Sequence, residues 1–256
     1  MLRKNKICVF VLLGLFIIIS PLCSQVKQSH SFVVGLIQLK DEINLGLVYN
    51  GFHLEYRYGI SWNINDHEIL YQPKLGVGIR NRNKFGMGAL YLHFAPVNVT
   101  WTMPIYDQNG HIIRVGTNFV ADYHFQRYHD FSDSNLFWTS EIGLSPVVSY
   151  QYQWDTKRIG VFLQNSLLGF TSHRQGYDIY SLPEDGIKYA RWFFVEPHKD
   201  LQFGTFNKYN HTNVSLEFVP NISKMHSILY EFDYFGSYYG SRFDRLGHNL
   251  LWRISL

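Results

Sequence analysis

The chain has 256 residues, of which 46% are hydrophobic and 17% aromatic, with 23 Lys and Arg against 20 Asp and Glu. Three of the basic residues, Arg3, Lys4 and Lys6, lie at the very start, so 20 of each sign remain after them and the rest of the chain is neutral. This balance gives no support for a nucleic-acid partner. The two cysteines, Cys8 and Cys23, are also N-terminal, which leaves no thiol for a disulfide, a thiolate metal site or a cysteine nucleophile further on.

Residues 1–24 are predicted to be a cleaved secretory signal peptide. The basic start is followed by an apolar run from Ile7 to Ile19 and by a short tail that ends at Ser24. The run is well short of the roughly 20 apolar residues that a membrane-spanning helix needs. We therefore expect a mature chain of residues 25–256, which form one domain.

Hydrophobic residues then alternate with polar ones along most of the chain, as in β-strands whose two faces meet different surroundings. The first predicted strand covers residues 43–49. Asn50 and Gly51 follow it, and this pair is a strong signal for a hairpin turn. The second predicted strand covers residues 52–62, and a turn is expected at 63–66.

The same alternation predicts ten further strands. Two places leave the count open, because the pattern continues across Ala95-Pro96 and across Ser145-Pro146. Each place is compatible with a hairpin or with one long strand. The predicted strands are residues 74–80, 85–92, 97–105, 113–124, 136–144, 148–154, 159–163, 214–218, 226–235 and 246–256.

The alternation breaks between Thr171 and His211, which is predicted to be a long loop. It contains strand-like segments near 187–195 and 201–206. Its aromatic and basic residues are candidates for a surface contact with a glycan, a peptide or a protein partner, or for packing on the barrel rim. These candidate surface-binding residues are Tyr189, Arg191, Trp192 and Phe193.

The two faces of the strands differ in a way that predicts a transmembrane barrel. In 226–235, for example, Ile228 and Tyr230 lie on one face, whereas Glu231 and Asp233 lie on the other. A soluble β-sandwich also alternates. The combination of an aromatic-rich apolar face with a polar face of mixed charges and glycines favours lipid outside and an enclosed interior. We expect an all-β fold, a single antiparallel up-and-down β-barrel of about 12 strands, within a range of ten to fourteen.

The last strand, Leu246–Leu256, resembles the C-terminal strand of Gram-negative outer-membrane β-barrels. Its hydrophobic residues alternate as in that family, but it ends in Leu256 and has its aromatic residue at Trp252. The resemblance implies location in the outer membrane, contact with outer-membrane lipid and recognition of this strand by the assembly machinery. It also implies periplasmic termini, with 171–211 and 236–245 outside the cell. A monomer is expected.

Charged residues on the polar faces are predicted to point into the barrel. They form either a narrow polar pore for small solutes or a set of opposite charges that pair and block the interior, since an unpaired buried charge is costly. These predicted lumen charges are Glu55, Arg57, Lys74, Arg80, Arg114, Asp122, Glu141, Glu217, Glu231, Asp233 and Arg253.

Catalysis is not expected. Phospholipase-like barrels carry a His-x-Ser pair on one strand, and this sequence has none; His226 and Ser227 are adjacent, so they face opposite sides of a strand. A lipid- or peptide-hydrolysing barrel remains an alternative, with His124 beside Asp122 or Asp130. No histidine spacing indicates a metal site, and no cofactor motif is present. The predicted role is therefore a narrow pore or a structural, surface-displaying barrel, with a receptor or adhesin acting through 171–211 as a third possibility.

Overall fold

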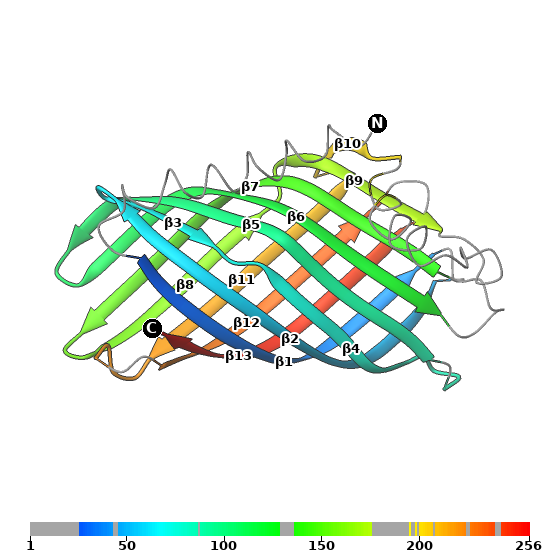
Figure 1. Cartoon of the computed structure of the whole chain (residues 1–256), viewed down its shortest axis with the longest axis horizontal. Coiled ribbons are helices and arrows are strands. Elements are labelled where there is room, and N and C mark those ends of the chain that lie inside the picture. Colours follow the sequence, from blue (N-terminus) through cyan, green and yellow to red (C-terminus); the bar gives the residue numbers. More distant parts are fainter. Residues whose placement is uncertain are drawn as a thin grey trace, which may run out of the picture.

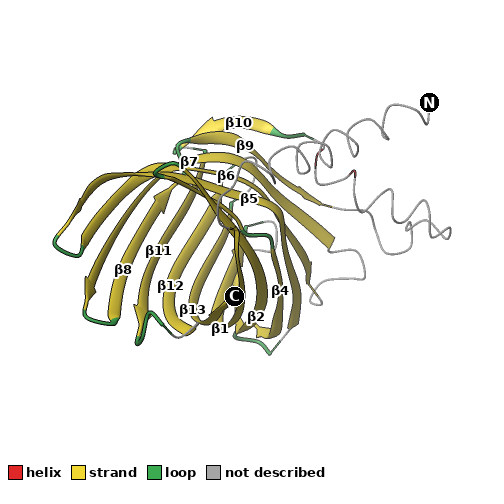
Figure 2. Cartoon of the chain, turned by 60° about the vertical axis from the view of Figure 1, so that its left-hand side comes forward, coloured by secondary structure: helices red, strands yellow, loops and turns green. Residues whose placement is uncertain are grey.

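The protein is a single antiparallel β-barrel in the computed structural model (Figure 1, Figure 2). The structure describes residues 26–42, 46–86, 88–128, 136–175, 195, 198, 200–206, 208–223, 226–238 and 242–256. Within these ranges no helix is both long and apolar enough to cross a membrane. The predicted signal peptide, residues 1–24, lies outside them.

The strands are β1 (Val26–Asp41), β2 (Leu47–Ile64), β3 (His67–Tyr71), β4 (Lys74–Arg82), β5 (Gly88–Gln108), β6 (His111–Tyr128), β7 (Leu136–Trp154), β8 (Lys157–Asn165), β9 (Leu168–Gln175), β10 (Gln202–Thr205), β11 (Tyr209–Val219), β12 (His226–Ser237) and β13 (Phe243–Ser255).

Ten strands form the closed ring of the barrel. They follow one another as β1, β2, β4, β5, β6, β7, β8, β11, β12 and β13, and β13 pairs with β1 to complete the ring. Three short strands lie off this path. β3 lies end to end with β4, and both pair with β2 and β5. β9 lies end to end with β8, and both pair with β7. β10 pairs with β9. The predicted barrel is thus confirmed, but its ring has ten strands and not about twelve.

Three predicted breaks between strands are absent, at Asn50-Gly51 and at the two prolines where the prediction stayed open, and the unpredicted β1 adds one strand, so the ring has two strands fewer than expected. β5 runs through Pro96 and β7 runs through Pro146, so each is one long strand. Proline lacks an N–H donor and fits a strand only where a partner is missing or the ladder is irregular. At both places the pairing on one side of the long strand is interrupted. Pro96 lies beside the gap between β3 and β4, and Pro146 lies beside the gap between β8 and β9.

The predicted turn at Asn50 and Gly51 was wrong. Both residues lie inside β2, and the Gln38 amide on β1 donates a hydrogen bond to the Asn50 side chain at 3.0 Å. The chain reverses instead between β1 and β2, where the Gly46 N–H donates to the Asp41 carbonyl at 2.9 Å and Gly46 has a φ of 64°. β1 itself was not predicted, because Ile37 and Leu39 are apolar on its inner face and so obscure the alternation.

The two ends of the barrel carry different connections. Gln28 and Leu256 exchange backbone hydrogen bonds, so the first and last strands begin and end together at what we call the terminal end. The opposite end, the loop end, carries the connections β6–β7, β9–β10 and β12–β13. The stretch 171–211 is strand at both of its margins, in β9 and in β10–β11, and the short strand expected near 201–206 is confirmed as β10.

Candidate functional site

The loop-end half of the interior is filled by a cluster of buried, mostly aromatic side chains, which we call the aromatic cluster. Tyr49, Tyr91, Phe235 and Phe243 are each 0% exposed. Rings from strands that are not neighbours contact each other inside the barrel, as in the pair Tyr49 on β2 and Tyr128 on β6, whose centroids are 4.9 Å apart. Among the described residues, these side chains form a packed, largely aromatic layer within the barrel. The cluster consists of Ile37, Leu39, Tyr49, Ala89, Tyr91, Tyr128, Phe137, Tyr209, Phe235 and Phe243.

On the terminal-end side of the aromatic cluster, Arg57 links two carboxylates at the centre of the barrel. Its Nε donates to Glu55 Oε1 at 2.6 Å, and its two terminal nitrogens donate to both oxygens of Glu231 at 2.6 and 2.7 Å. The paired geometry with Glu231 is the bidentate arrangement that guanidinium and carboxylate favour. Glu231 also accepts from the Asn249 amide at 3.1 Å. Two strands that are not neighbours are thereby joined, since Arg57 belongs to β2 and Glu231 to β12, with β1 and β13 between them.

His93 extends this group across two more strands. Its Nδ1 lies 2.5 Å from Glu55 Oε2 and its Nε2 lies 2.7 Å from Asp122 Oδ1. Both carboxylates can only accept when ionised, so an imidazole between them satisfies both best when it carries two protons. β2, β5 and β6 are therefore connected through one buried ring.

A second group repeats the pattern on the opposite wall. His211 Nδ1 lies 2.7 Å from Glu141 Oε2, and its Nε2 lies 3.0 Å from Asp233 Oδ1. Arg245 donates to the other oxygen of Asp233 and is 1% exposed. Arg245 was predicted to lie in an exposed connection, and that was wrong: β13 begins at Phe243, so alternation turns Arg245 into the lumen.

The terminal-end half of the interior is hollow and polar. A cavity of about 200 Å³ begins at Arg57 and Glu231 and is lined by amide and hydroxyl side chains such as Asn118 and Thr100. A second cavity of about 430 Å³ shares part of this lining and reaches Leu256 at the terminal end. The interior is therefore a cup whose floor is the central ion network and the aromatic cluster.

The predicted lumen charges all lie on strands of the ring. Five of them, Glu55, Arg57, Asp122, Glu231 and Asp233, join in the network, as does Glu141 through His211. Lys74, Arg114, Glu217 and Arg253 line the cup, where Arg253 donates to Glu217 at 3.0 Å. The side chain of Arg80 lies outside the described part of the chain. Asp130 and the surface-binding candidates Tyr189, Arg191, Trp192 and Phe193 also lie outside it.

The candidate hydrolytic pair, His124 and Asp122, is enclosed. His124 Nε2 is 3.7 Å from Asp122 Oδ2, and His124 Nδ1 is 2.8 Å from the Tyr91 hydroxyl. His124 is 0% exposed and stands against Phe235, with ring centroids 4.9 Å apart. Neither residue lines the two cavities of the cup.

Sequence reasoning did not single out His53, His93, His211 or Arg245. His53 is two residues before Glu55 and so shares its face, which is a signal that the sequence does contain. The pairing of His93 with Glu55 and Asp122 depends on which strands are neighbours and in what register, and no local pattern encodes this.

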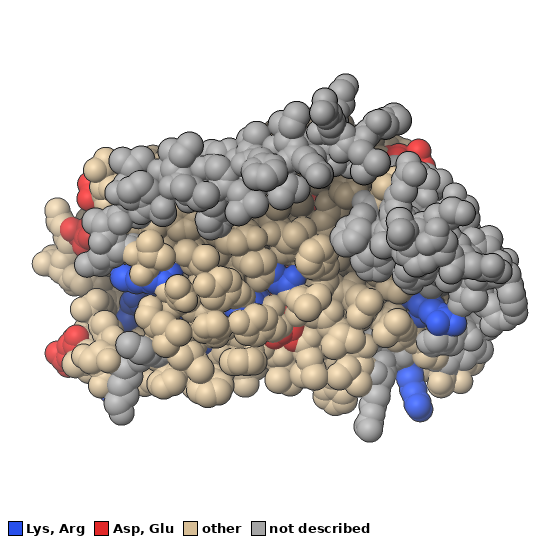
Figure 3. Space-filling view, in the orientation of Figure 1, with Lys and Arg blue, Asp and Glu red and all other residues tan. Residues whose placement is uncertain are grey.

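The outer wall of the barrel is apolar. Phe32, Leu36, Leu250 and Trp252 are each at least 50% exposed, and the face in Figure 3 is largely free of charged side chains. Toward the terminal end, aromatic and histidine rings stack on the outer surface. Examples are His67–Trp101, His111–Tyr152 and His226–Trp252. An apolar wall next to a band of amphipathic rings is typical of membrane barrels, and a soluble monomer rarely exposes so much apolar surface.

Comparison with known proteins gives similarity of fold only. No family model matches the chain, and no curated protein matches its sequence. Among solved structures, the outer-membrane protease OmpT from Escherichia coli aligns with a TM-score of 0.53 at 8% identity, over 91% of this chain and 96% of that one. Neisserial surface protein A aligns with a TM-score of 0.36 at 9% identity, over 90% of this chain and 99% of that one. The translocator domain of NalP from Neisseria meningitidis aligns with a TM-score of 0.39 at 7% identity, over 98% of this chain and 97% of that one. The closed ring of antiparallel strands and the alignment with OmpT show that the chain has the fold of the Gram-negative outer-membrane β-barrels.

Proposed function

We propose that the protein is a non-conducting outer-membrane barrel of a Gram-negative bacterium, with a structural or surface-displaying role. The observation that carries this proposal is the double closure of the lumen. The central ion network joins strands that are not neighbours, β2 with β12 and β7 with β11, and the aromatic cluster fills the loop-end half behind it. A pore for small solutes would need a continuous polar path, and the polar cup stops at Arg57 and Glu231.

The membrane arrangement rests on the outer wall and on the family orientation. Apolar side chains would face lipid, and the terminal-end rings would lie at one membrane interface. The termini and the cup would then face the periplasm, and the loop-end connections the outside. Insertion through recognition of Leu246–Leu256 and a monomeric state remain part of this proposal.

Conductance measurements test the closure directly. The refolded protein in planar lipid bilayers should give no stepwise ionic current, because no water-filled path crosses the network and the cluster. A general porin inserted under the same conditions is the positive control. Reproducible, ion-selective current steps from the purified protein would contradict a closed lumen and support the narrow pore.

A hydrolytic role is not supported, because His124 and Asp122 are enclosed. The protein should release no fatty acid from phospholipid vesicles and cleave no peptide substrate, and His124→Ala should behave in the same way. His226→Ala, on the outer surface, is the matched control. Turnover that disappears in His124→Ala but persists in His226→Ala would show that the buried pair is catalytic.

A further inference from the structure

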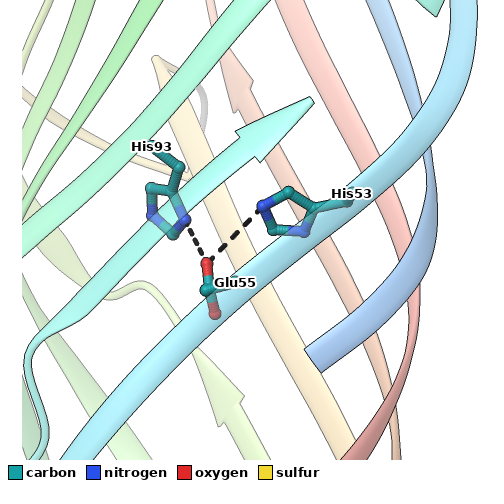
Figure 4. Close-up of side chains that lie close together, drawn as sticks. All are labelled: His53, Glu55 and His93. Carbon is teal, nitrogen blue, oxygen red and sulfur yellow. Dashed lines mark hydrogen bonds and ion pairs between the residues drawn. The ribbon is translucent and has the colours of Figure 1, made fainter. Parts of the chain in front are cut away.

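The central network contains a group of metal-binding type that the closed-barrel role does not use. His53, Glu55 and His93 each present one ligand atom, and these atoms lie within 4.8 Å of one another (Figure 4). Glu55 Oε2 is the shared centre, at 3.7 Å from His53 Nε2 and 2.5 Å from His93 Nδ1. His53 and His93 are 1% exposed and Glu55 is 5% exposed.

One of these atoms is unsatisfied. His53 Nε2 is buried and has no hydrogen-bond partner among the described residues. A buried polar atom without a partner costs roughly 1–3 kcal/mol, so such atoms call for an explanation. His53 Nε2 points toward Glu55 in Figure 4, which places the unsatisfied atom inside the group.

The space beside His53 Nε2 is kept open by a glycine. Gly76 on β4 lies opposite Glu55 of β2 and His93 of β5 in the strand pairing. A Cβ added to Gly76 would stand 2.5 Å from His53 Nε2 and 3.2 Å from Glu55 Oε2. Any side chain at position 76 would therefore occupy the volume between the ligand atoms.

The charge of the network also favours a cation. Five carboxylates belong to it, and Arg57, Arg245 and the nearby Lys74 supply three positive charges, which leaves a balance of minus two with neutral histidines. Protonated His93 and His211 are one way to offset this surplus, and a bound divalent cation is another. The carboxylates are Glu55, Asp122, Glu141, Glu231 and Asp233.

We propose that His53 Nε2, Glu55 Oε2 and His93 Nδ1 bind a Zn²⁺ ion, with the fourth position on the side of Gly76. Two imidazoles and one carboxylate are a zinc ligand set, and zinc–ligand bonds of about 2.0–2.2 Å imply ligand atoms about 3.4 Å apart. The 3.7 Å between His53 Nε2 and Glu55 Oε2 already approaches this separation. The 2.5 Å between His93 Nδ1 and Glu55 Oε2 would lengthen when His93 Nδ1 releases its proton to solvent and binds the metal instead.

The surroundings suit this assignment. His93 Nε2 would keep donating to Asp122, and Arg57 would keep donating to the second oxygen of Glu55. A ligand histidine that donates its other N–H to a carboxylate is the usual support of a zinc site. Two neighbouring groups, His93–Asp122–His124 and Asp122–Glu141–His211, also contain suitable atoms. What distinguishes the group at His53 is Gly76, whose Cβ position lies 2.5 Å from the unsatisfied His53 Nε2.

Metal binding to the full mature chain tests the proposal. The protein is refolded in detergent with and without ZnCl₂, freed of excess metal, and assayed for zinc content and for competition by a chromophoric chelator, with Co²⁺ absorption as a second readout. We expect one tightly bound Zn²⁺ per chain. His53→Gln should weaken binding by at least 10-fold, and Asp122→Asn by about 10–100-fold. Gly76→Ala should weaken it with every ligand still present.

Two controls define the site. His124→Gln alters a buried histidine outside the ligand set, and His226→Gln alters one on the outer surface; both should retain the zinc. Heat-modifiable gel migration shows that each variant is folded. A folded wild-type protein that retains no zinc under either refolding condition would overturn the proposal. So would equal losses in His124→Gln and His53→Gln, or unchanged binding in Gly76→Ala.

Discussion

Replacing Arg57 with alanine should destabilise the barrel by about 3–5 kcal/mol, because it leaves Glu55 and Glu231 as buried charges without their shared partner. Arg57 makes three hydrogen bonds to these two carboxylates. The free energy of unfolding can be measured in lipid vesicles by urea titration, with tryptophan fluorescence and gel migration as probes.

Arg242→Ala is the matched control for this experiment. The Arg242 side chain is 46% exposed and pairs with Asp244 near the barrel end, so its loss should change stability by about 1 kcal/mol or less. Adding Glu231→Gln to Arg57→Ala should recover part of the loss, since one uncompensated charge disappears. Equal effects of Arg57→Ala and Arg242→Ala would show that the central network does not hold the walls together.

An arginine in place of Leu250 should destabilise the membrane-inserted barrel by about 2–4 kcal/mol, since that is the cost of a cation on the lipid face near the bilayer midplane. Leu250 is 58% exposed on the outer wall and pairs with Val34 and Tyr230 near the middle of the strands. The same unfolding titration in vesicles measures the effect.

Val26→Arg separates membrane depth from exposure. Val26 is 53% exposed, nearly as much as Leu250, but it lies at the terminal end of β1. An interfacial arginine should cost about 0–1 kcal/mol. If both substitutions had the same small effect, the apolar wall would not lie across a bilayer, and the proposed membrane location would fail.

Burial explains why the charged groups of the central network contact partners on other strands. Burial removes water as a hydrogen-bond partner, so each charge in the floor of the cup needs a partner from another strand. Toward the terminal end, where the cavity is larger, Arg158, Glu217 and Arg253 make longer contacts of 3.0–3.3 Å and are more exposed. The interior therefore changes from closely packed and buried to open and more exposed along a single set of strands.

The sequence alone determined the class of fold and the face on which most side chains lie. A strand has a period of two, so the placement of Glu231 and Asp233 inside and of Ile228 and Tyr230 outside follows from order along the chain. The tertiary structure decided everything that depends on which strands are neighbours. Examples are the run of β5 and β7 through Pro96 and Pro146, the ring of ten strands, and the meeting of His93 with Glu55 and Asp122. Local alternation fixes the face on which a side chain lies, but it does not say which distant strand is the partner or which residue lies opposite.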